Sequence, residues 1–156
     1  PVTIGDMTTT TVAGRFPLVF LVFNTIMNLT TQAEQVACFR NAAAHLSPGG
    51  AFIVEVMVPQ VQRLPEGARH VPFAINDRHW GVDEYDLVTQ GLVSHHLHFA
   101  GDQTRRNSVP FRYVWPSELD LMAQLAGLRL AGRWEDWERK PFTAGSASHV
   151  SVWVKE

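Results

Sequence analysis

Cysteine is nearly absent from this chain of 156 residues, in which Cys38 is the single example. An internal disulfide needs two cysteines, so a packed core must hold the fold, and a lone thiol is typical of a reducing, cytoplasmic environment. Cys38 lies between Ala37 and Phe39 in a segment with helical periodicity. We therefore interpret it as a packing residue rather than as a nucleophile.

A surplus of one charge and a long apolar run are also missing. The 13 Lys and Arg residues against 15 Asp and Glu residues leave a formal net charge of −2 at pH 7. This balance supplies no electrostatic attraction for nucleic acid or for an anionic membrane surface. The apolar run Phe16–Phe23 is far shorter than the roughly 20 residues that a bilayer-spanning helix needs. We expect a globular protein with no nucleic-acid partner and no membrane partner.

The glycines are too dispersed to build a nucleotide-binding loop. None of the 11 glycines takes part in a G-x-G-x-x-G pattern. In α/β proteins that pattern turns the chain tightly and brings the backbone close to the bound cofactor. A loop of this kind is therefore not expected within these residues.

What the sequence does contain begins with a buried strand and a capped helix. Residues 16–23 are apolar without a break, which is typical of a strand buried on both faces, so we predict a strand over Leu18–Phe23. Pro17 has no N–H to give to a strand ladder and should stand at the strand's first residue. Thr31-Gln-Ala-Glu34 forms a capping box and predicts a helix over Gln32–His45.

A second buried strand follows this helix. Ser47-Pro-Gly-Gly50 ends the helix, and Ala51–Val58 is apolar except for Glu55. A strand, a helix and a strand in this order predict a parallel crossover unit. A short β-type stretch, Val2–Ile4, precedes the whole unit.

The middle of the chain is expected to hold one hairpin. Residues Pro59–Gly81 are rich in proline, glycine and charge, and we expect them to be irregular. Asp86–Phe99 and Asn107–Trp115 have the pattern of two antiparallel strands, which Ala100–Thr104 would connect.

The last third predicts a helix and two closing strands. Ser117 is expected to cap a helix over Glu118–Ala126, and Gly127 to end it. Strands are predicted over Leu128–Trp134 and His149–Val154, with the last strand antiparallel to its neighbours.

Several of these segments occur in an order that is known from one protein family. They are Gly5-Asp6-Met7, Phe16-Pro-Leu-Val-Phe20, Asn24-Thr-Ile-Met-Asn-Leu29, Leu46-Ser-Pro-Gly-Gly50 and Trp115-Pro-Ser-Glu-Leu-Asp-Leu-Met-Ala123 with Leu125-Ala-Gly-Leu-Arg-Leu130. In this order and spacing they resemble the later motifs of class I, or Rossmann-like, S-adenosylmethionine-dependent methyltransferases. The resemblance covers essentially the whole chain. Pro17 departs from it, because the family usually has an acidic residue there.

The resemblance implies a fold and an activity. The fold is α/β: a partial Rossmann-like methyltransferase sheet with flanking helices, an inserted antiparallel hairpin and a terminal antiparallel strand. Residues 1–156 would form a single, incomplete domain with the insertion at about 59–115, corresponding to the carboxy-terminal two-thirds of such an enzyme. The activity would be methyl transfer from S-adenosylmethionine to a small-molecule substrate. A non-catalytic α/β interaction domain derived from a methyltransferase is the alternative.

The resemblance also implies cofactor-binding residues. Asp6 would accept a hydrogen bond from the adenine amino group, and the Met7 backbone N–H would meet the ring. Phe23, Asn24 and Thr25 would border the methionine end, in keeping with ligand binding beyond the carboxyl ends of parallel strands. Two alternatives stay open, in which Asp6 belongs to an ordinary turn and Asn24 is a capped loop residue. Because the family's glycine-rich loop is missing, this chain alone is expected to bind S-adenosylmethionine weakly or not at all.

No catalytic residue stands out on the acceptor side. Methyl transfer from a sulfonium is an in-line displacement, in which aligning the nucleophile, the methyl group and the sulfur is the main task. A base is needed only when the acceptor must lose a proton. His79 and Tyr85, both in the inserted region, are candidates for such a base, although an isolated histidine in a polar loop is more often solvated.

The run His95-His96-Leu97-His98 raises the question of a metal site. In a strand, His96 and His98 share one face while His95 points to the other. Two ligands are too few for a closed zinc site, and residues 106–113 contain no histidine that could supply a third. We therefore predict no metal site and interpret the group as a polar sheet face.

The family's missing strands would leave Leu18–Phe23 at the edge of the sheet. A long, apolar, uncharged edge is prone to aggregation or strand pairing, and Pro17 would protect only its start. Either Val2–Ile4 or a second copy of the chain could cover it. We expect the second copy, which would make the protein a two-fold homodimer or another edge-paired oligomer.

Overall fold

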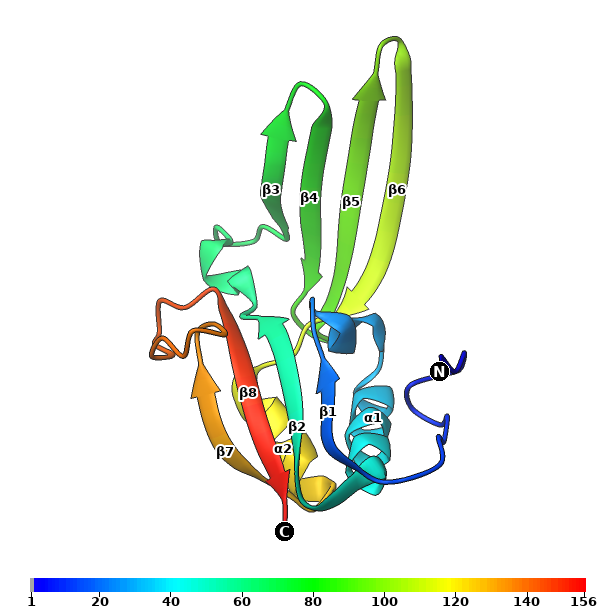
Figure 1. Cartoon of the computed structure of the whole chain (residues 1–156). Coiled ribbons are helices and arrows are strands. Elements are labelled where there is room, and N and C mark those ends of the chain that lie inside the picture. Colours follow the sequence, from blue (N-terminus) through cyan, green and yellow to red (C-terminus); the bar gives the residue numbers. More distant parts are fainter. Residues whose placement is uncertain (1) are drawn as a thin grey trace. The chain divides into compact units, whose positions relative to one another are not determined.

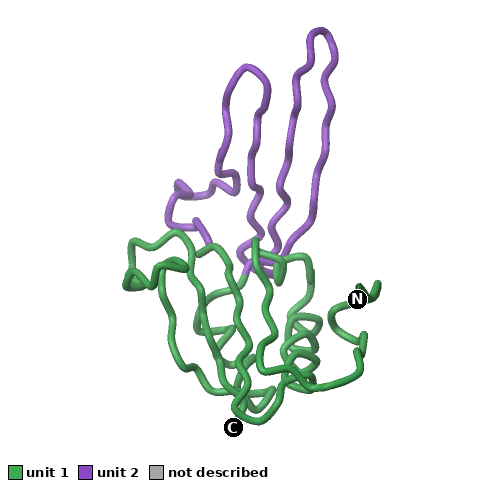
Figure 2. The backbone as a smooth tube through the Cα atoms, in the orientation of Figure 1, with its two compact units in different colours: residues 1–58, 114–156 green, residues 59–113 purple. Residues whose placement is uncertain are grey.

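The chain divides into two compact units in the computed structural model, which describes residues 2–156. Unit 1 combines the residues up to Val58 with Val114–Glu156, and unit 2 is Pro59–Tyr113 (Figure 2). Each unit contains one four-stranded sheet. Within residues 2–156, the structure contains no helix with the length and apolar character needed to cross a membrane.

Unit 1 is the mixed α/β part of the chain, as the sequence predicts (Figure 1). Its sheet has the strand order β1-β2-β8-β7, in which β1 and β2 are parallel and β8 is antiparallel to both of its neighbours. Two helices, α1 and α2, pack against each other, α1 lying on β1 and β2 and α2 on β7. The elements are β1 (Phe16–Leu21), η1 (Thr25–Asn28), α1 (Gln32–His45), β2 (Leu46–Met57), α2 (Pro116–Leu125), β7 (Leu128–Trp134) and β8 (Ser148–Lys155).

Aromatic rings from three elements form the centre of the unit 1 core. Phe39 on α1 meets Phe52 on β2 and Trp153 on β8 edge to face, with ring centroids 5.0 and 5.3 Å apart. All three side chains are fully buried. Edge-to-face pairs of this kind add about 0.5–1.5 kcal/mol each beyond the burial of their area. Cys38 is buried on the same helix, and burial raises the pKa of its thiol to about 12, as expected for a packing residue.

Local capping fixes α1 where the sequence places it. The Thr31 hydroxyl accepts a hydrogen bond from the Glu34 backbone N–H at 3.2 Å, and the Thr31 N–H donates to the Glu34 carboxylate at 2.9 Å. The helix accordingly spans Gln32–His45 as predicted. Strand β7 also has the predicted bounds, and β8 exceeds its prediction by one residue at each end.

Several details of unit 1 differ from the sequence predictions. Strand β1 spans Phe16–Leu21 rather than Leu18–Phe23, and β2 spans Leu46–Met57 rather than Ala51–Val58. Helix α2 spans Pro116–Leu125 with Trp115 as its N-cap, whereas the sequence predicted Glu118–Ala126 with Ser117 as the cap. Proline suits the first helical position, where no N–H is needed. Pro17 is the second residue of β1, and the register shifts beside it. Val2–Ile4 is not a strand.

Unit 2 is an antiparallel sheet with the order β3-β4-β5-β6, larger than the predicted hairpin. The expectation that Pro59–Gly81 is irregular is wrong from residue 70 onward, where β3 and the start of β4 lie. The predicted strand Asp86–Phe99 is in fact the end of β4, a turn and β5. The turn ends at Gln90, whose φ is 60°. The elements are η2 (Gln60–Arg63), β3 (His70–Asn76), β4 (His79–Asp86), β5 (Gly91–Ala100) and β6 (Gln103–Arg112).

The expected hairpin is present as β5 and β6, with a tighter connection than predicted. Ala100 pairs with Gln103, so only Gly101 and Asp102 form the turn. Gly101 has a φ of 59°, in the left-handed region that the turns of short hairpins require and that glycine adopts without strain.

Candidate functional site

The loop after β1 is tied to the end of the neighbouring strand β2. Asn24 donates its backbone N–H to the Glu55 carbonyl at 3.3 Å, and its side-chain oxygen accepts from the Met57 N–H at 2.7 Å. Asn24 therefore holds the carboxyl ends of two parallel strands together. This is a structural role of the kind that the sequence left open for Asn24, and it lies at the edge where open α/β sheets bind ligands.

Two consecutive residues of this loop have a left-handed backbone. Phe23 and Asn24 have φ values of 55° and 59°, which are uncommon for residues other than glycine. The Phe23 N–H donates to the Glu55 carboxylate at 3.2 Å, while the Phe23 side chain is 86% exposed. Residues in sparsely populated backbone regions cost about 1–3 kcal/mol each and cluster at binding sites. The loop thus presents an aromatic ring to solvent on a strained, anchored backbone.

Thr25 turns the chain away from this loop into η1. Its backbone N–H and its hydroxyl both donate to the Val22 carbonyl. The short helix that follows buries Ile26 and Met27 completely or nearly so. The Thr25 side chain is therefore engaged in shaping the loop.

Asp6 and Met7 lie in a separate turn before β1. The Asp6 carboxylate accepts from the backbone N–H and the hydroxyl of Thr8, both at 2.7 Å, and these bonds lower the pKa of Asp6. The Met7 carbonyl accepts from the side chain of Asn41 on α1 at 3.0 Å. The turn that the sequence offered as an alternative is thus present.

A small apolar pocket lies between this turn, α1 and β1. Its volume is about 220 Å³ and Met7 is one of its lining residues, whereas Asp6, Phe23, Asn24 and Thr25 do not line it. Pockets for drug-sized ligands have volumes of about 300–1,000 Å³. The structure therefore does not bring the five predicted cofactor residues together around one cavity.

The two candidate bases lie on β4, in unit 2. Tyr85 is fully buried, and burial raises the pKa of its hydroxyl, which makes the phenolate harder to form at neutral pH. His79 is partly exposed. Partial burial lowers the pKa of His79, and the neighbouring His98 and His96 lower it further.

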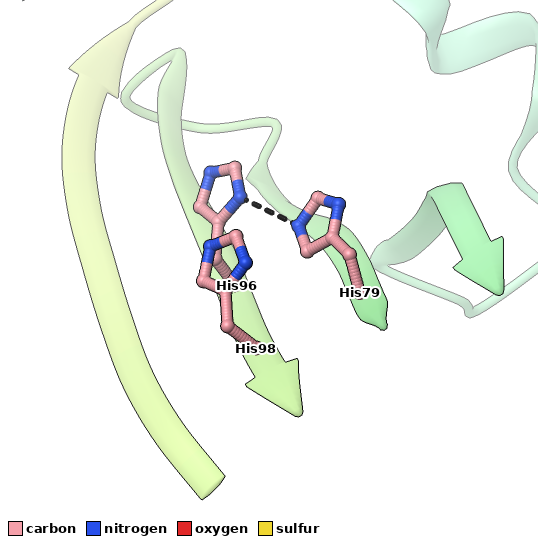
Figure 3. A group of neighbouring side chains, drawn as sticks. All are labelled: His79, His96 and His98. Carbon is pink, nitrogen blue, oxygen red and sulfur yellow. Dashed lines mark hydrogen bonds between the residues drawn. The ribbon is translucent and has the colours of Figure 1, made fainter. Parts of the chain in front are cut away.

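His79 is not isolated, because it lies beside two of the histidines on β5 (Figure 3). Its Nε2 is 3.0 Å from Nδ1 of His96, and its ring is stacked on that of His98 with centroids 4.5 Å apart. One ligand nitrogen from each of the three residues lies within 4.8 Å of the others. The premise that only two histidines share this face is wrong, since the third comes from β4 rather than from β6.

A buried polar cluster in unit 1 has no counterpart in the sequence predictions. The Arg133 guanidinium on β7 forms two hydrogen bonds with the Asp120 carboxylate on α2, at 2.7 and 3.2 Å. Arg133 also donates to the Ser151 hydroxyl at 2.7 Å, and His149 Nδ1 lies 2.8 Å from that hydroxyl. Burial lowers the pKa of the fully buried His149 to about 4, and the Arg133 charge acts in the same direction.

Glu55 gave a weak signal in the sequence. It is the single polar residue of the apolar segment Ala51–Val58, and a half-buried carboxylate at such a place needs a partner. Its partner, the Phe23 N–H, is 32 residues away in the chain, and no local pattern reveals such a contact.

Known proteins share this architecture. No family model matches the chain. The structure of the CcbJ methyltransferase from Streptomyces caelestis matches with a TM-score of 0.86 and 35% identity, over 98% of this chain and 63% of that one. A cypemycin N-terminal methyltransferase from Streptomyces sp is 30% identical over 153 residues, which are 95% of this chain and 62% of that protein.

A more distant structure shows the same fold. An S-adenosylmethionine-dependent methyltransferase from Clostridium acetobutylicum matches with a TM-score of 0.77 at 12% identity, over 98% of this chain and 63% of that one. The chain thus has the class I, Rossmann-like fold of S-adenosylmethionine-dependent methyltransferases, over a part of their length. It spans less than two thirds of the length of each of these relatives.

Proposed function

We propose that this chain is part of a methyltransferase that transfers the methyl group of S-adenosylmethionine to a small-molecule acceptor. The observation that carries the proposal is the match to the Streptomyces caelestis methyltransferase, at 35% identity over 98% of this chain. The Streptomyces relative is named for methylating the N-terminus of cypemycin, so an amine is the acceptor chemistry to test first. An amine that is already unprotonated needs no catalytic base for this transfer.

The methionine end of the cofactor is proposed to lie against the loop Phe23–Thr25. Two features support this position. The loop lies beyond the carboxyl ends of β1 and β2, and the exposed Phe23 ring can interact with the positively charged sulfonium. The hydrogen bonds from the backbone N–H groups of Asn24 and Phe23 to β2 anchor the backbone of this loop.

The adenine end is proposed to lie at Asp6 and Met7. The bonds from Thr8 both go to Oδ1 of Asp6, so Oδ2 is the oxygen that we assign to the adenine amino group. The Met7 backbone N–H would meet the ring. Because these residues and the loop Phe23–Thr25 do not line one cavity here, residues outside this chain are expected to supply most of the cofactor contacts.

The proposal is tested by binding and by transfer. Calorimetric titration of the 156-residue chain with S-adenosylhomocysteine should give weak binding or none. The same titration on a protein that carries these residues with the flanking sequence of the gene should give clear binding. Asn24→Ala should weaken it, and Asn107→Ala, which changes an exposed asparagine of unit 2, should not. Binding of the 156-residue chain at micromolar Kd or better would show that the cofactor residues are misplaced.

Transfer is followed with S-adenosylmethionine that carries a labelled methyl group. The acceptors are a panel of small amines, small alcohols and a short peptide with a free N-terminus. Label in one of these acceptors supports the proposal. A longer protein that neither binds the cofactor nor transfers the label would favour the alternative, a non-catalytic interaction domain.

A further inference from the structure

The sheet of unit 2 places three imidazoles on one face by strand register alone. His79 on β4 pairs directly with His98 on β5, and Gly81 pairs with His96. Residues two apart in a strand point to the same face, so the three histidine rings are gathered in one place. Figure 3 shows the rings of His96 and His98 on one strand facing the ring of His79 on the next.

The distances are close to those of a metal centre. A zinc ion binds histidine nitrogen at about 2.0–2.1 Å, so two ligand nitrogens in a tetrahedral site are about 3.3 Å apart. The nitrogens of His79 and His96 are 3.0 Å apart, and the widest separation in the group is at most 4.8 Å. The wider separations involve His98, whose exposed side chain has room to turn towards a bound ion.

The outer nitrogen of His96 has the partner that a metal-bound histidine usually has. Its Nε2 lies 3.2 Å from the Ser94 hydroxyl, which in turn forms a hydrogen bond with the Asp83 carboxylate. Metal ligands that are histidines typically donate their second N–H to an oxygen that fixes the ring and its tautomer. Here the arrangement directs Nδ1 of His96 towards His79.

The Phe73 side chain on β3 packs against two of the three histidine rings. The Phe73 ring meets His96 and His79 edge to face, with centroids 5.3 and 6.0 Å apart. It lies over Gly81, where a Cβ atom would come within 2.3 Å of the ring. The positive charge on this face comes from Arg105, the exposed register partner of His98, and the negative charge from Asp83.

We propose that His79, His96 and His98 form a binding site for a divalent transition-metal ion of the zinc class. Imidazole ligands suit Zn²⁺, Ni²⁺ and Cu²⁺ and not the hard ions Mg²⁺ and Ca²⁺. Three ligands on an exposed strand pair leave a coordination position open to water or to another ligand. The site is independent of the cofactor site proposed above, so either proposal can fail without the other.

The experiment is a calorimetric titration of the untagged chain with Zn²⁺ at pH 7.5, repeated with Mg²⁺. One Zn²⁺ per chain should bind and Mg²⁺ should not. His96→Ala, His79→Ala and His98→Ala should each weaken Zn²⁺ binding at least 10-fold, and Ser94→Ala, which removes an orienting partner, about 10-fold. Replacing Zn²⁺ by Co²⁺ should give the visible absorption of a four-coordinate ion in the wild type.

His95→Ala is the matched control, because His95 is in the same strand but bonds Glu84 and Ser108. It should bind Zn²⁺ as the wild type does. Far-ultraviolet circular dichroism of each variant separates loss of a ligand from loss of folding. Absence of one-to-one binding in the wild type would overturn the proposal and leave a hydrogen-bonded row of imidazoles only. An equal loss in His95→Ala and in the three ligand variants would overturn it as well.

Discussion

The two units of this chain use their sheets in different ways. In unit 1 the sheet lies under two helices, and the rings of Phe39, Phe52 and Trp153 are fully buried. In unit 2 the sheet carries half-exposed aromatics such as Phe73 and a row of partly exposed histidines. Apolar burial therefore stabilises unit 1, whereas strand register arranges the polar groups of unit 2.

The largest effect is expected from the aromatic core. Phe52→Ala should lower the free energy of unfolding by about 3–5 kcal/mol, because it removes a fully buried ring and leaves a cavity. Phe73→Ala in unit 2 should cost about 1 kcal/mol or less, since that side chain is 45% exposed. Urea unfolding followed by circular dichroism measures both values. Equal losses of unfolding free energy in the two variants would show that apolar burial stabilises both units alike.

The next effect concerns ion pairs. Asp120→Ala should destabilise the chain by about 3–4 kcal/mol, because it leaves the Arg133 guanidinium without its carboxylate at a side chain that is 13% exposed. The matched change in unit 2 is Glu84→Ala, which removes the partner of His95. It should leave the urea midpoint almost unchanged. A large shift in the Glu84 variant would show that unit 2 also depends on internal polar contacts.

A pH series probes the buried His149. Its lowered pKa means that the unfolded chain binds a proton more readily than the folded chain. The contribution of His149 to the free energy of unfolding is therefore complete above pH 6.5 and is lost as the pH drops towards 4. The change in pKa from 6.5 to about 4 corresponds to about 3 kcal/mol at about 1.36 kcal/mol per pKa unit.

Urea midpoints at pH 7.5, 6.0 and 5.0 should show this loss. His149→Gln should reduce the dependence on pH between these values. His70→Gln is the control, since this unit 2 imidazole is 58% exposed, and it should keep the wild-type loss. An unchanged slope in the His149 variant would refute the assignment.

Substitutions at the sheet edges should change the free energy of unfolding least. They should nevertheless change the association of the chains clearly. In the described structure β1 lies at the edge of unit 1 and exposes Leu18 and Phe20, whereas the edge strand β6 of unit 2 contains Arg105 and Arg106. Charges on an edge oppose strand pairing. We expect the 156-residue chain to form a homodimer through β1, as the sequence predicts.

Light scattering at low micromolar concentration tests this dimer. Phe20→Lys should convert it to a monomer, and Thr104→Lys in β6 should leave it intact. A wild-type monomer whose β1 amides exchange rapidly with solvent would contradict the prediction.

Elements with local signals can be located from the amino-acid sequence alone. The capping box Thr31–Glu34 fixed α1 to the residue, because both of its hydrogen bonds join residues three apart. The alternation of residues in His149–Val154 located β8 to within one residue at each end, and β7 has the bounds predicted for it. The order of the motifs predicted the methyltransferase fold that the comparisons show. Such signals depend on residues a few positions apart, so they locate single helices and strands.

Contacts between side chains that are distant in the sequence depend on the tertiary fold. His79 joins His96 because β4 and β5 pair in one particular register, and a shift by one residue would send His79 to the other face. Asn24 bonds to β2, more than 30 residues away in the chain, because that strand ends beside it. Pairing of this kind depends on the fold as a whole, since the free energy that selects a register is summed over every contact in the sheet and its core.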